Sequence, residues 1–444
     1  MRKRFRTSAW LSGIAAASLA GVVALTAVTA VAQEEKVVVG VPSFLTGAGA
    51  PAFGLPARNG AEVMINAINA GEAPAPYDTK GFAGRELEAI YYDESGGNTK
   101  QVTEFRNKAQ KQGVNVFIGF ISSGTCQAIA PIAEELKTLT VFSTCGTPRV
   151  FEEIDTNPKY VFRTMSHSAA DGVAAARYVA AKYPNVKGYT GINQNYGWGQ
   201  DSWRDFDLAM QVLMPNTTAS DKLQWPKLFA GQYGAEISAL MLAPEELVHT
   251  SLWGGDLEAF IFQAAPRGLF KRKQLLFSVA GTAAYRLNEK MPEGAILGSR
   301  GPYGIYAANL VDTPLNNWFQ KTYRDRYNTP PTQGAYQYAQ SLLGLKMAYD
   351  KAAAANGGKF PSTEQVIAQL EGLEFQGVAT TVKMALNGGH QGMTEHMMGV
   401  AKWDPAKGEP VVIDVLRFDA ECVMPPDGVN SVDWIKGGMK GAKC

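Results

Sequence analysis

The stretch GFISSGTCQAIAPIAEEL (119–136) sets two hydroxyls at the start of an expected helix. The apolar run VNVFIGF in front of it predicts a strand, and Ser122 and Ser123 follow where the helix begins. A helix N-terminus offers unpaired backbone N–H groups and about half a positive charge. Together with the two hydroxyls, these groups suit a carboxylate or another oxygen-rich group. The alternative interpretation is that one serine caps its own helix.

Patterns for catalysis are weak in this sequence. The context of Ser122 lacks the G-x-S-x-G pattern of a hydrolase nucleophile, and no Walker A sequence occurs. Asp93 and Glu94 are adjacent at a strand end, where helix capping or a contact between lobes is favoured over acid–base work. His390 and His396 lie in a Gly-rich loop, which favours solvent-exposed histidines over a metal pair. We therefore predict a protein that is not an enzyme and that holds neither a cofactor nor a metal.

Short apolar strands alternate with helical segments, and this alternation predicts parallel sheets with helices on both faces. One such α/β unit occupies the first part of the chain and a second follows from about residue 169. The Gly-rich segment 294–310 reads as an extended connector, and short antiparallel strands close the chain. Ligands of open parallel sheets collect at the carboxyl ends of the strands. Four loops are expected at such ends: 122–125, 143–147, 193–199 and 253–258.

The N-terminus carries the pattern of a secretory signal over residues 1–32. MRKRFR is followed by an apolar run from Ala9 to Val31 that ends in AVA. The alternative is an uncleaved membrane anchor. Without the four positive charges of MRKRFR, 38 Lys and Arg residues face 41 Asp and Glu residues. This near-neutral balance gives no electrostatic footprint for nucleic acid, and we expect a periplasmic protein that begins near Gln33.

Export would permit disulfides among the four cysteines. Cys422 and Cys444 bracket a tail rich in Gly and Lys, and Cys126 and Cys145 lie near the ends of neighbouring expected strands. Spacing alone leaves disulfides and free buried thiols both open.

Eight segments in order and spacing resemble the leucine/isoleucine/valine-binding family of periplasmic solute-binding proteins, which serve ABC importers. The resemblance covers residues 36 to about 415. It implies a type I periplasmic binding fold, with two Rossmann-like α/β lobes of parallel strands joined by a three-stranded hinge. Lobe one would hold 36–165 and 300–375, lobe two 166–299 and 376–420, and a C-terminal tail 421–444. The segments are VVVGVPSFLTG, YYDESGGNTKQV, GFISSGTCQAIAPIAEE, VFSTCGTPRVFE, YVFRTMSHSAADGVAAARYV, NQNYGWGQDSW, SLWGGDLEAFIFQA and PLNNWFQKTYRDRYNTPP.

The same resemblance implies a binding site between the lobes. Ser122 and Ser123 match the serines that grip a ligand carboxylate, and the backbone and threonine hydroxyl of the loop ending at Thr147 match the rest of that grip. Tyr196 matches an aromatic residue of lobe two that closes over the ligand. The implied ligand-binding residues are Phe44, Ser122, Ser123, Cys145, Gly146, Thr147, Tyr196 and Asp256.

One departure bears on the ligand. Ala280 stands where amino-acid-binding members of the family carry an acidic residue for the ligand's ammonium. A buried ammonium needs a partner, so either Asp256 or Glu258 replaces that acid, or the ligand has no amino group. The aromatic residues Tyr196, Trp198 and Trp253 leave room for an aromatic acid or for a cation held over a ring.

We predict a monomeric exported protein that captures a small amino acid or other small carboxylate and delivers it to ABC permease subunits. Nucleic acid is not an expected partner. The alternatives are a ligand-sensing receptor module of the same fold, or a binder of an aromatic acid or an amide.

Overall fold

The first part of the chain and a later segment form a mixed sheet of eight strands. The computed structural model describes residues 35–444, and in it these strands lie in the order β11-β12-β13-β5-β4-β3-β1-β2. β1 to β5 and β13 run parallel, whereas β12 and β11 pair in antiparallel fashion at one edge. We call this sheet with its helices the first lobe. The strands are β1 Val37–Ser43, β2 Leu87–Asp93, β3 Val116–Gly119, β4 Leu139–Phe142, β5 Val161–Arg163, β11 Glu374–Gln376, β12 Thr381–Leu386 and β13 Gln391–Met393.

A second sheet of seven strands has the order β15-β14-β10-β9-β8-β6-β7. Its strands from β6 to β10 run parallel, and β14 and β15 add an antiparallel pair at the edge. We call this sheet with its helices the second lobe. The strands are β6 Gly188–Ile192, β7 Thr218–Ala219, β8 Leu247–Thr250, β9 Gln274–Phe277, β10 Ile296–Ser299, β14 His396–Asp404 and β15 Glu409–Phe418.

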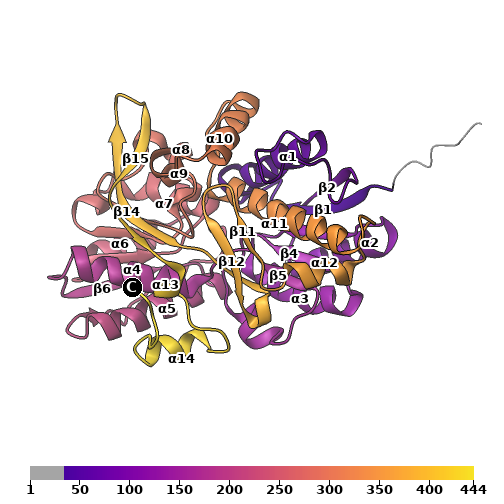
Figure 1. Cartoon of the computed structure of the whole chain (residues 1–444). Coiled ribbons are helices and arrows are strands. Elements are labelled where there is room, and N and C mark those ends of the chain that lie inside the picture. The colour runs from indigo at the N-terminus through magenta and orange to yellow at the C-terminus, as the bar shows by residue number, and fades with distance from the viewer. Residues whose placement is uncertain (1–34) are drawn as a thin grey trace, which may run out of the picture. The chain divides into compact units, whose positions relative to one another are not determined.

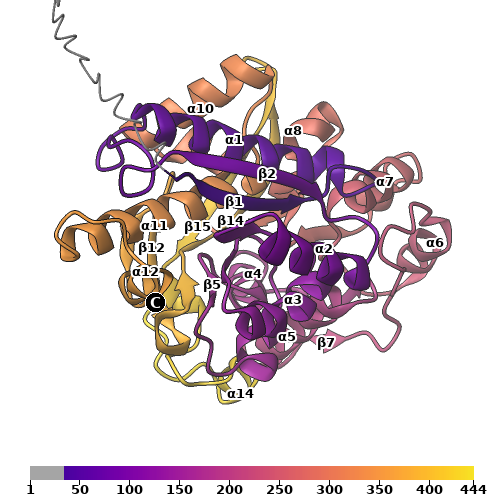
Figure 2. The same cartoon turned by 90° about the vertical axis from the view of Figure 1, so that its right-hand side faces the viewer.

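Helices cover both sheets (Figure 1). In the first lobe, β1 and β2 lie between α1 on one side and α2 and α3 on the other (Figure 2). The helices of the first lobe are α1 Leu55–Ala70, α2 Asn98–Lys111, α3 Ser123–Leu136, α10 Pro314–Tyr327, α11 Gln333–Ala355 and α12 Thr363–Leu370. Those that pack with the second sheet are α4 Ser168–Lys182, α5 Gly197–Leu213, α6 Gly234–Leu242, α7 Gly254–Ala264, α8 Ala284–Leu287, α9 Ile305–Leu310, α13 Ala420–Val423 and α14 Ser431–Lys436.

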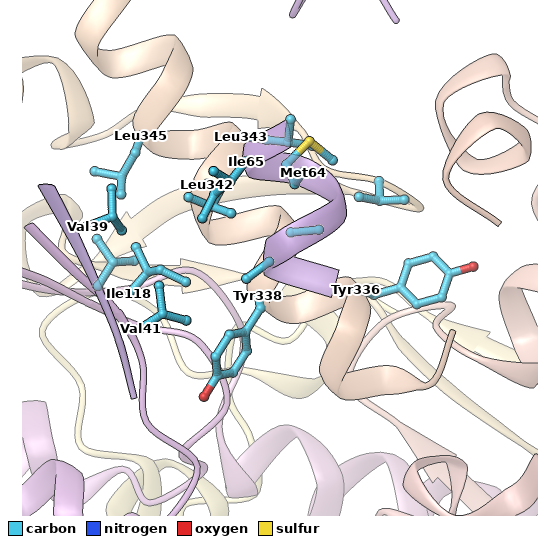
Figure 3. Close-up of a cluster of buried hydrophobic side chains, with 14 of the residues drawn as sticks. Val39, Val41, Met64, Ile65, Ile118, Tyr336, Tyr338, Leu342, Leu343 and Leu345 are labelled. Carbon is cyan, nitrogen blue, oxygen red and sulfur yellow. The ribbon is translucent and has the colours of Figure 1, made fainter. Parts of the chain in front are cut away.

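The core of the first lobe forms where α1 and α11 pack over β1 and β3 (Figure 3). Val39, Ile118 and Leu342 are fully buried there, and burial of each such side chain contributes about 2 kcal/mol. The two helices approach closely at Gly60, where a Cβ atom would lie 2.3 Å from the carbonyl oxygen of Ala335. A glycine is therefore needed for this helix contact.

Three chain crossings join the lobes, after β5, β10 and β13. Hydrogen bonds from side chains to the backbone link the crossings: the Ser166 hydroxyl donates to the Thr394 carbonyl at 2.9 Å, and the Thr394 hydroxyl donates to the Arg300 carbonyl at 3.3 Å. The expected two-lobed α/β fold with a three-stranded hinge is confirmed. Its sheets are mixed rather than purely parallel, because the C-terminal strands add antiparallel edges.

Some local expectations differ from the structure. Residues 294–310 contain strand β10 and helix α9 and are more than a connector. The division into lobes stays a prediction, but β12 and β13 belong to the first sheet, so residues 376–393 do not lie in the second lobe as expected. The predicted signal peptide, 1–32, lies outside the described residues. Within residues 35–444, each helix is too short or too polar to cross a membrane.

Both cysteine pairs that the sequence left open are disulfides. Cys126 of α3 is bonded to Cys145 in the loop after β4, and Cys422 of α13 is bonded to Cys444 at the C-terminal end. The first bond joins the start of α3 to a neighbouring loop of the expected binding site.

Candidate ligand-binding cleft

Loops from the carboxyl ends of both sheets enclose a small cavity between the lobes. The cavity has a volume of about 20 Å³, which is room for a single water molecule. Small-molecule sites typically measure about 300–1,000 Å³, so a solute can occupy this place only after the lining has moved apart. The lining consists of Phe53, Ile121, Ser123, Thr144, Gly146 and Gln333 from the first lobe, Tyr196, Trp198, Trp253 and Val279 from the second lobe, and Arg300 from the hinge.

Arg300 brings a cation into this lining. Its Nε and Nη2 donate to the Asp171 carboxylate at 2.7–3.0 Å, and its Nη1 donates to the Thr144 carbonyl at 3.1 Å. The guanidinium carbon lies 4.4 Å from the centroid of the Trp198 ring. Arg300 is only 3% exposed, and Asp171 supplies the counter-charge that a buried cation needs. Burial raises the pKa of Asp171 to about 6, although Arg300 acts to lower it.

Aromatic rings form most of the second-lobe side of the cavity. The Trp198 indole N–H donates to the Ser251 carbonyl at 2.9 Å, and the Trp253 indole N–H donates to the Tyr196 hydroxyl at 2.9 Å. Trp253 also packs edge to face on Phe53 of the first lobe, with ring centroids 5.8 Å apart. These hydrogen bonds fix the orientation of the rings, so the lining presents flat apolar faces.

Phe44, expected in the binding site, lies in a second row of aromatic rings. Its ring centroid is 5.7 Å from that of Trp253 and 5.8 Å from that of Phe229. Phe44 therefore packs against Trp253 and lies outside the cavity lining.

The backbone before α3 holds an internal carboxylate. Oε1 and Oε2 of Glu94 accept hydrogen bonds from the N–H groups of Ser122 and Ile121, each at 2.8 Å. Glu94 is 1% exposed, and burial raises its pKa to about 7, opposed by these two N–H donors and the Thr125 hydroxyl. Glu94 therefore holds the backbone that leads into α3, and its partners are the N–H groups of the N-cap residue and of the residue before it. Ser122 occupies the N-cap position of α3, but its hydroxyl makes no capping hydrogen bond there.

Ser123 and the loop after β4 lie together, as the sequence indicated. The N–H of Thr147 donates to the Ser123 hydroxyl at 3.3 Å, and Gly146 and Ser123 both line the cavity. The Thr147 hydroxyl instead donates to Asp201 of α5, at 2.7 Å. Cys145 has its sulfur in the disulfide and its carbonyl oxygen bonded to Arg163 at 3.0 Å.

Asp256 lies at the start of α7, where it organises the second lobe. Its carboxylate accepts hydrogen bonds from the Gln194 side chain and the Phe229 N–H, both at 2.6 Å, and from the Gly231 N–H at 3.4 Å. Asp256 is fully buried and lies outside the cavity lining. Glu258 forms an ion pair with Arg286 on the surface. Asp256 and Glu258 were the residues expected to replace the missing acid as partner of a ligand ammonium, and both already have partners within the protein.

The structure adds residues that sequence reasoning missed. Arg300, Gln333 and Thr144 are the polar ones, and Phe53, Ile121 and Val279 complete the lining. Arg300 had one usable signal, since it is a lone charge between the apolar ILGS and the Gly-rich GPYG.

The histidines expected on the surface are buried. His390 stacks on Phe162 with ring centroids 4.0 Å apart, and His396 is fully buried near Asp171. The Gly-rich sequence suggested a loop, but both residues flank β13 inside the sheets. Among residues 35–444, no group of three His, Cys, Asp or Glu side chains is placed to hold a metal ion.

Comparison with known proteins identifies the family. The sequence model described as periplasmic binding protein matches residues 36–409. The chain belongs to the periplasmic binding protein family. It is accordingly a solute-binding protein and not an enzyme, and its family implies an extracytoplasmic location. No curated protein matches the sequence significantly.

Solved structures of solute-binding proteins share the fold. A solute-binding protein of an ABC transporter from Rhodopseudomonas palustris BisB5, in complex with 3,4-dihydroxybenzoic acid, is 18% identical with a TM-score of 0.72, covering 87% of this chain and 98% of its own. One from R. palustris in complex with benzoate is 17% identical, with a TM-score of 0.71 and coverages of 86% and 96%. A leucine-binding protein from Thermotoga maritima is 19% identical, with a TM-score of 0.69 and coverages of 86% and 98%.

Proposed function

We propose that this protein captures a small aromatic carboxylate between its lobes and delivers it to the permease of an ABC importer. The observation that carries the proposal is the buried guanidinium of Arg300, which lies over the Trp198 ring in a cavity lining that also includes Trp253 and Tyr196. A cation with a forked set of donors binds a carboxylate, and the rings suit a flat apolar body.

Arg300 retains donors for a solute. Its bonds to Asp171 and to the Thr144 carbonyl use three of the five N–H groups of a guanidinium. The pair with Asp171 is neutral, so a bound carboxylate would add one negative charge to the cleft. The first turn of α3, beginning at Ser123, offers unpaired N–H groups that stabilise such a charge.

An amino acid fits this cleft less well. Its ammonium would need an acidic partner, yet Ala280 replaces the expected acid and Asp256 is held by Gln194 and by backbone N–H groups. The related structures with benzoate and 3,4-dihydroxybenzoic acid are consistent with a solute that lacks an amino group.

The delivery step is part of the proposal. We take the protein to be exported by the predicted signal at residues 1–32, to act as a monomer in the periplasm, and to engage permease subunits when the lobes have closed. Of the ligand-binding residues expected from sequence, Ser123, Gly146 and Tyr196 line the cavity. We propose these three, with Arg300 and Trp198, as the direct contacts of the solute.

Thermal unfolding of the protein from Gln33 onward tests the solute class. The panel holds benzoate, 4-hydroxybenzoate, 3,4-dihydroxybenzoate, benzamide, leucine and valine, because a ligand that binds the folded state raises the Tm. We expect the aromatic acids to raise the Tm and leucine and valine to leave it unchanged. A shift with leucine alone would overturn the proposal. A shift with benzamide equal to that with benzoate would show that the negative charge of the carboxylate does not contribute to binding.

Variants at Arg300 test the site itself. Arg300→Gln combined with Asp171→Asn removes both charges, so that no buried carboxylate is left unpaired. We expect benzoate affinity, measured by calorimetry, to fall by at least about 30-fold, the equivalent of ~2 kcal/mol. The matched control is Arg286→Gln with Glu258→Gln, which removes an ion pair of the second-lobe surface and should leave affinity unchanged.

A further inference from the structure

The segment after α13 is anchored on the second lobe at both of its ends. The Cys422–Cys444 disulfide closes it, and the Lys443 N–H donates to the Glu421 carbonyl at 3.0 Å. Within it, α14 packs beside α5 (Figure 1). Trp434, 4% exposed, and the fully buried Ile435 join the apolar cluster formed by α4 and α5. The second lobe therefore holds this segment firmly.

The middle of the same segment bonds to the first lobe. Glu152, between β4 and β5, accepts hydrogen bonds from the Ser431 N–H at 3.2 Å, the Ser431 hydroxyl at 2.9 Å and the Asn430 side chain at 2.9 Å. Asp427 accepts a hydrogen bond at 2.6 Å from the N–H of Asn387, which follows β12. Glu152 and Asn387 both belong to the first lobe.

We propose that residues 422–444 form a strap that ties the two lobes together and favours the closed cleft. Separation of the lobes would pull α14, carried by the second lobe, away from Glu152 and Asn387. Glu152 accepts hydrogen bonds from a backbone N–H, a hydroxyl and a side-chain amide of this segment, and opening of the lobes would break all of them together. The proposed role of the strap depends on the capture of a solute between the lobes, but it does not depend on the solute's chemical class.

The disulfide keeps the C-terminal end of the strap attached to the second lobe at α13. Without the bond, the last residues could leave α13, and α14 would be held on the second lobe by its apolar contacts alone. With it, the segment is a closed loop whose two ends share one anchor on the second lobe. Opening of the lobes then has to break the contacts at Glu152 and Asp427, or separate α14 from the apolar cluster of α4 and α5.

The test compares Glu152→Gln and Ser431→Ala with the unaltered protein and with Lys436→Gln, a change on the exposed face of α14. Small-angle X-ray scattering without solute reports the opening of the lobes. Hydrogen exchange reports protection of the cleft loops 143–147 and 193–199. We expect a larger radius of gyration and at least about threefold faster exchange in both loops for Glu152→Gln and Ser431→Ala, and no change for Lys436→Gln. Unchanged scattering and unchanged exchange in both strap variants would overturn the proposal.

Two further variants distinguish the strap from a local loosening around Glu152. Cys422→Ser with Cys444→Ser leaves the Glu152 contact in place but removes the anchor, and it should open the lobes in the same direction. The Glu152→Gln and Ser431→Ala changes combined should act less than additively, because they remove the same contact. Scattering and exchange need no ligand, so they test the strap even if benzoate fails to bind. Where benzoate does bind, its dissociation should be at least about threefold faster in both variants.

Discussion

The Thr147 hydroxyl of the first lobe donates a 2.7 Å hydrogen bond to the Asp201 carboxylate of the second lobe. The same carboxylate accepts hydrogen bonds from Nε and Nη2 of Arg149, also of the first lobe, at 2.9 and 2.7 Å. Thr147 was expected to bind a solute carboxylate, and in this closed arrangement a protein carboxylate takes its hydrogen bond. The contact lies between the lobes and must break when they part.

Removal of the Asp201 charge should therefore loosen the closed form. Asp201→Asn leaves Arg149 with a weaker partner, and loss of one member of a buried ion pair costs about 3–5 kcal/mol; because Arg149 is partly exposed, we expect a loss of ~2 kcal/mol. Urea unfolding measures this loss. Asp221→Asn, on an exposed loop of the second lobe, is the control. Equal stability of both variants would show that the contact of Asp201 with Thr147 and Arg149 does not stabilise the folded protein.

Ser122 and Ser123 should differ in solute binding although they are neighbours. Ser123 lines the cavity, whereas Ser122 lies outside the lining and has its N–H bonded to Glu94. A lost hydrogen bond to a charged ligand costs about 1.5–3 kcal/mol, so Ser123→Ala should weaken benzoate binding roughly tenfold or more. Ser122→Ala should leave it unchanged in the same calorimetric titration. If Ser122→Ala weakened binding and Ser123→Ala did not, the solute would instead bind at Ser122, the N-cap residue of α3.

The general plan of the molecule was predictable from sequence because it depends on periodicity. Continuous apolar strands alternating with helices gave both lobes, and the loops at strand ends gave the position of the cleft. Ser123, Gly146 and Tyr196 lie in these loops and line the cavity, but their choice as ligand-binding residues came from the family resemblance.

The missed residues depend on contacts between segments far apart in the chain. Arg300 lines the cleft because it lies in the crossing that follows β10, and its partner Asp171 is far away in sequence. Glu94 meets the backbone before α3 because β2 and β3 both flank β1. Asp256 looked free for a ligand, but its partners Gln194 and Phe229 come from other loops. No local pattern encodes such contacts.

Gly146 should be essential for closure over a solute. A Cβ atom there would lie 2.2 Å from Nη2 of Arg300 and 2.5 Å from the Trp198 ring. Gly146→Ala must displace both side chains, so we expect benzoate affinity to fall at least about tenfold, which corresponds to ~1.4 kcal/mol. Gly124→Ala is the matched control, because its Cβ atom would find its nearest neighbour, Asn98, at 3.4 Å. Equal affinity of the two variants would show that the Arg300–Trp198 stack is not part of the site.

His249 should make the stability of the second lobe depend on pH. The side chain is fully buried, stacked on Phe206 and bonded to Ser278, and burial lowers its pKa from 6.5 to about 3. Below pH 6.5 His249 becomes protonated in the unfolded chain, whereas in the folded protein it stays neutral until about pH 3. The stability that the neutral His249 provides is thus complete above pH 6.5 and is lost as the pH falls toward 3.

A comparison of variants isolates this effect from carboxyl groups that act in the opposite sense. Burial raises the pKa of Glu94 and Glu152 to about 7, so these groups favour the folded state at lower pH. In His249→Phe the histidine contribution disappears while theirs remains. The free energy of unfolding of the unaltered protein, relative to this variant, should therefore fall by ~2 kcal/mol between pH 7 and pH 5. Phe206→Leu weakens the same core without a titrating group, and its difference from the unaltered protein should stay constant. Urea unfolding across this range measures both differences, and a constant difference for His249→Phe would mean that the folded protein accepts the proton as readily as the unfolded chain.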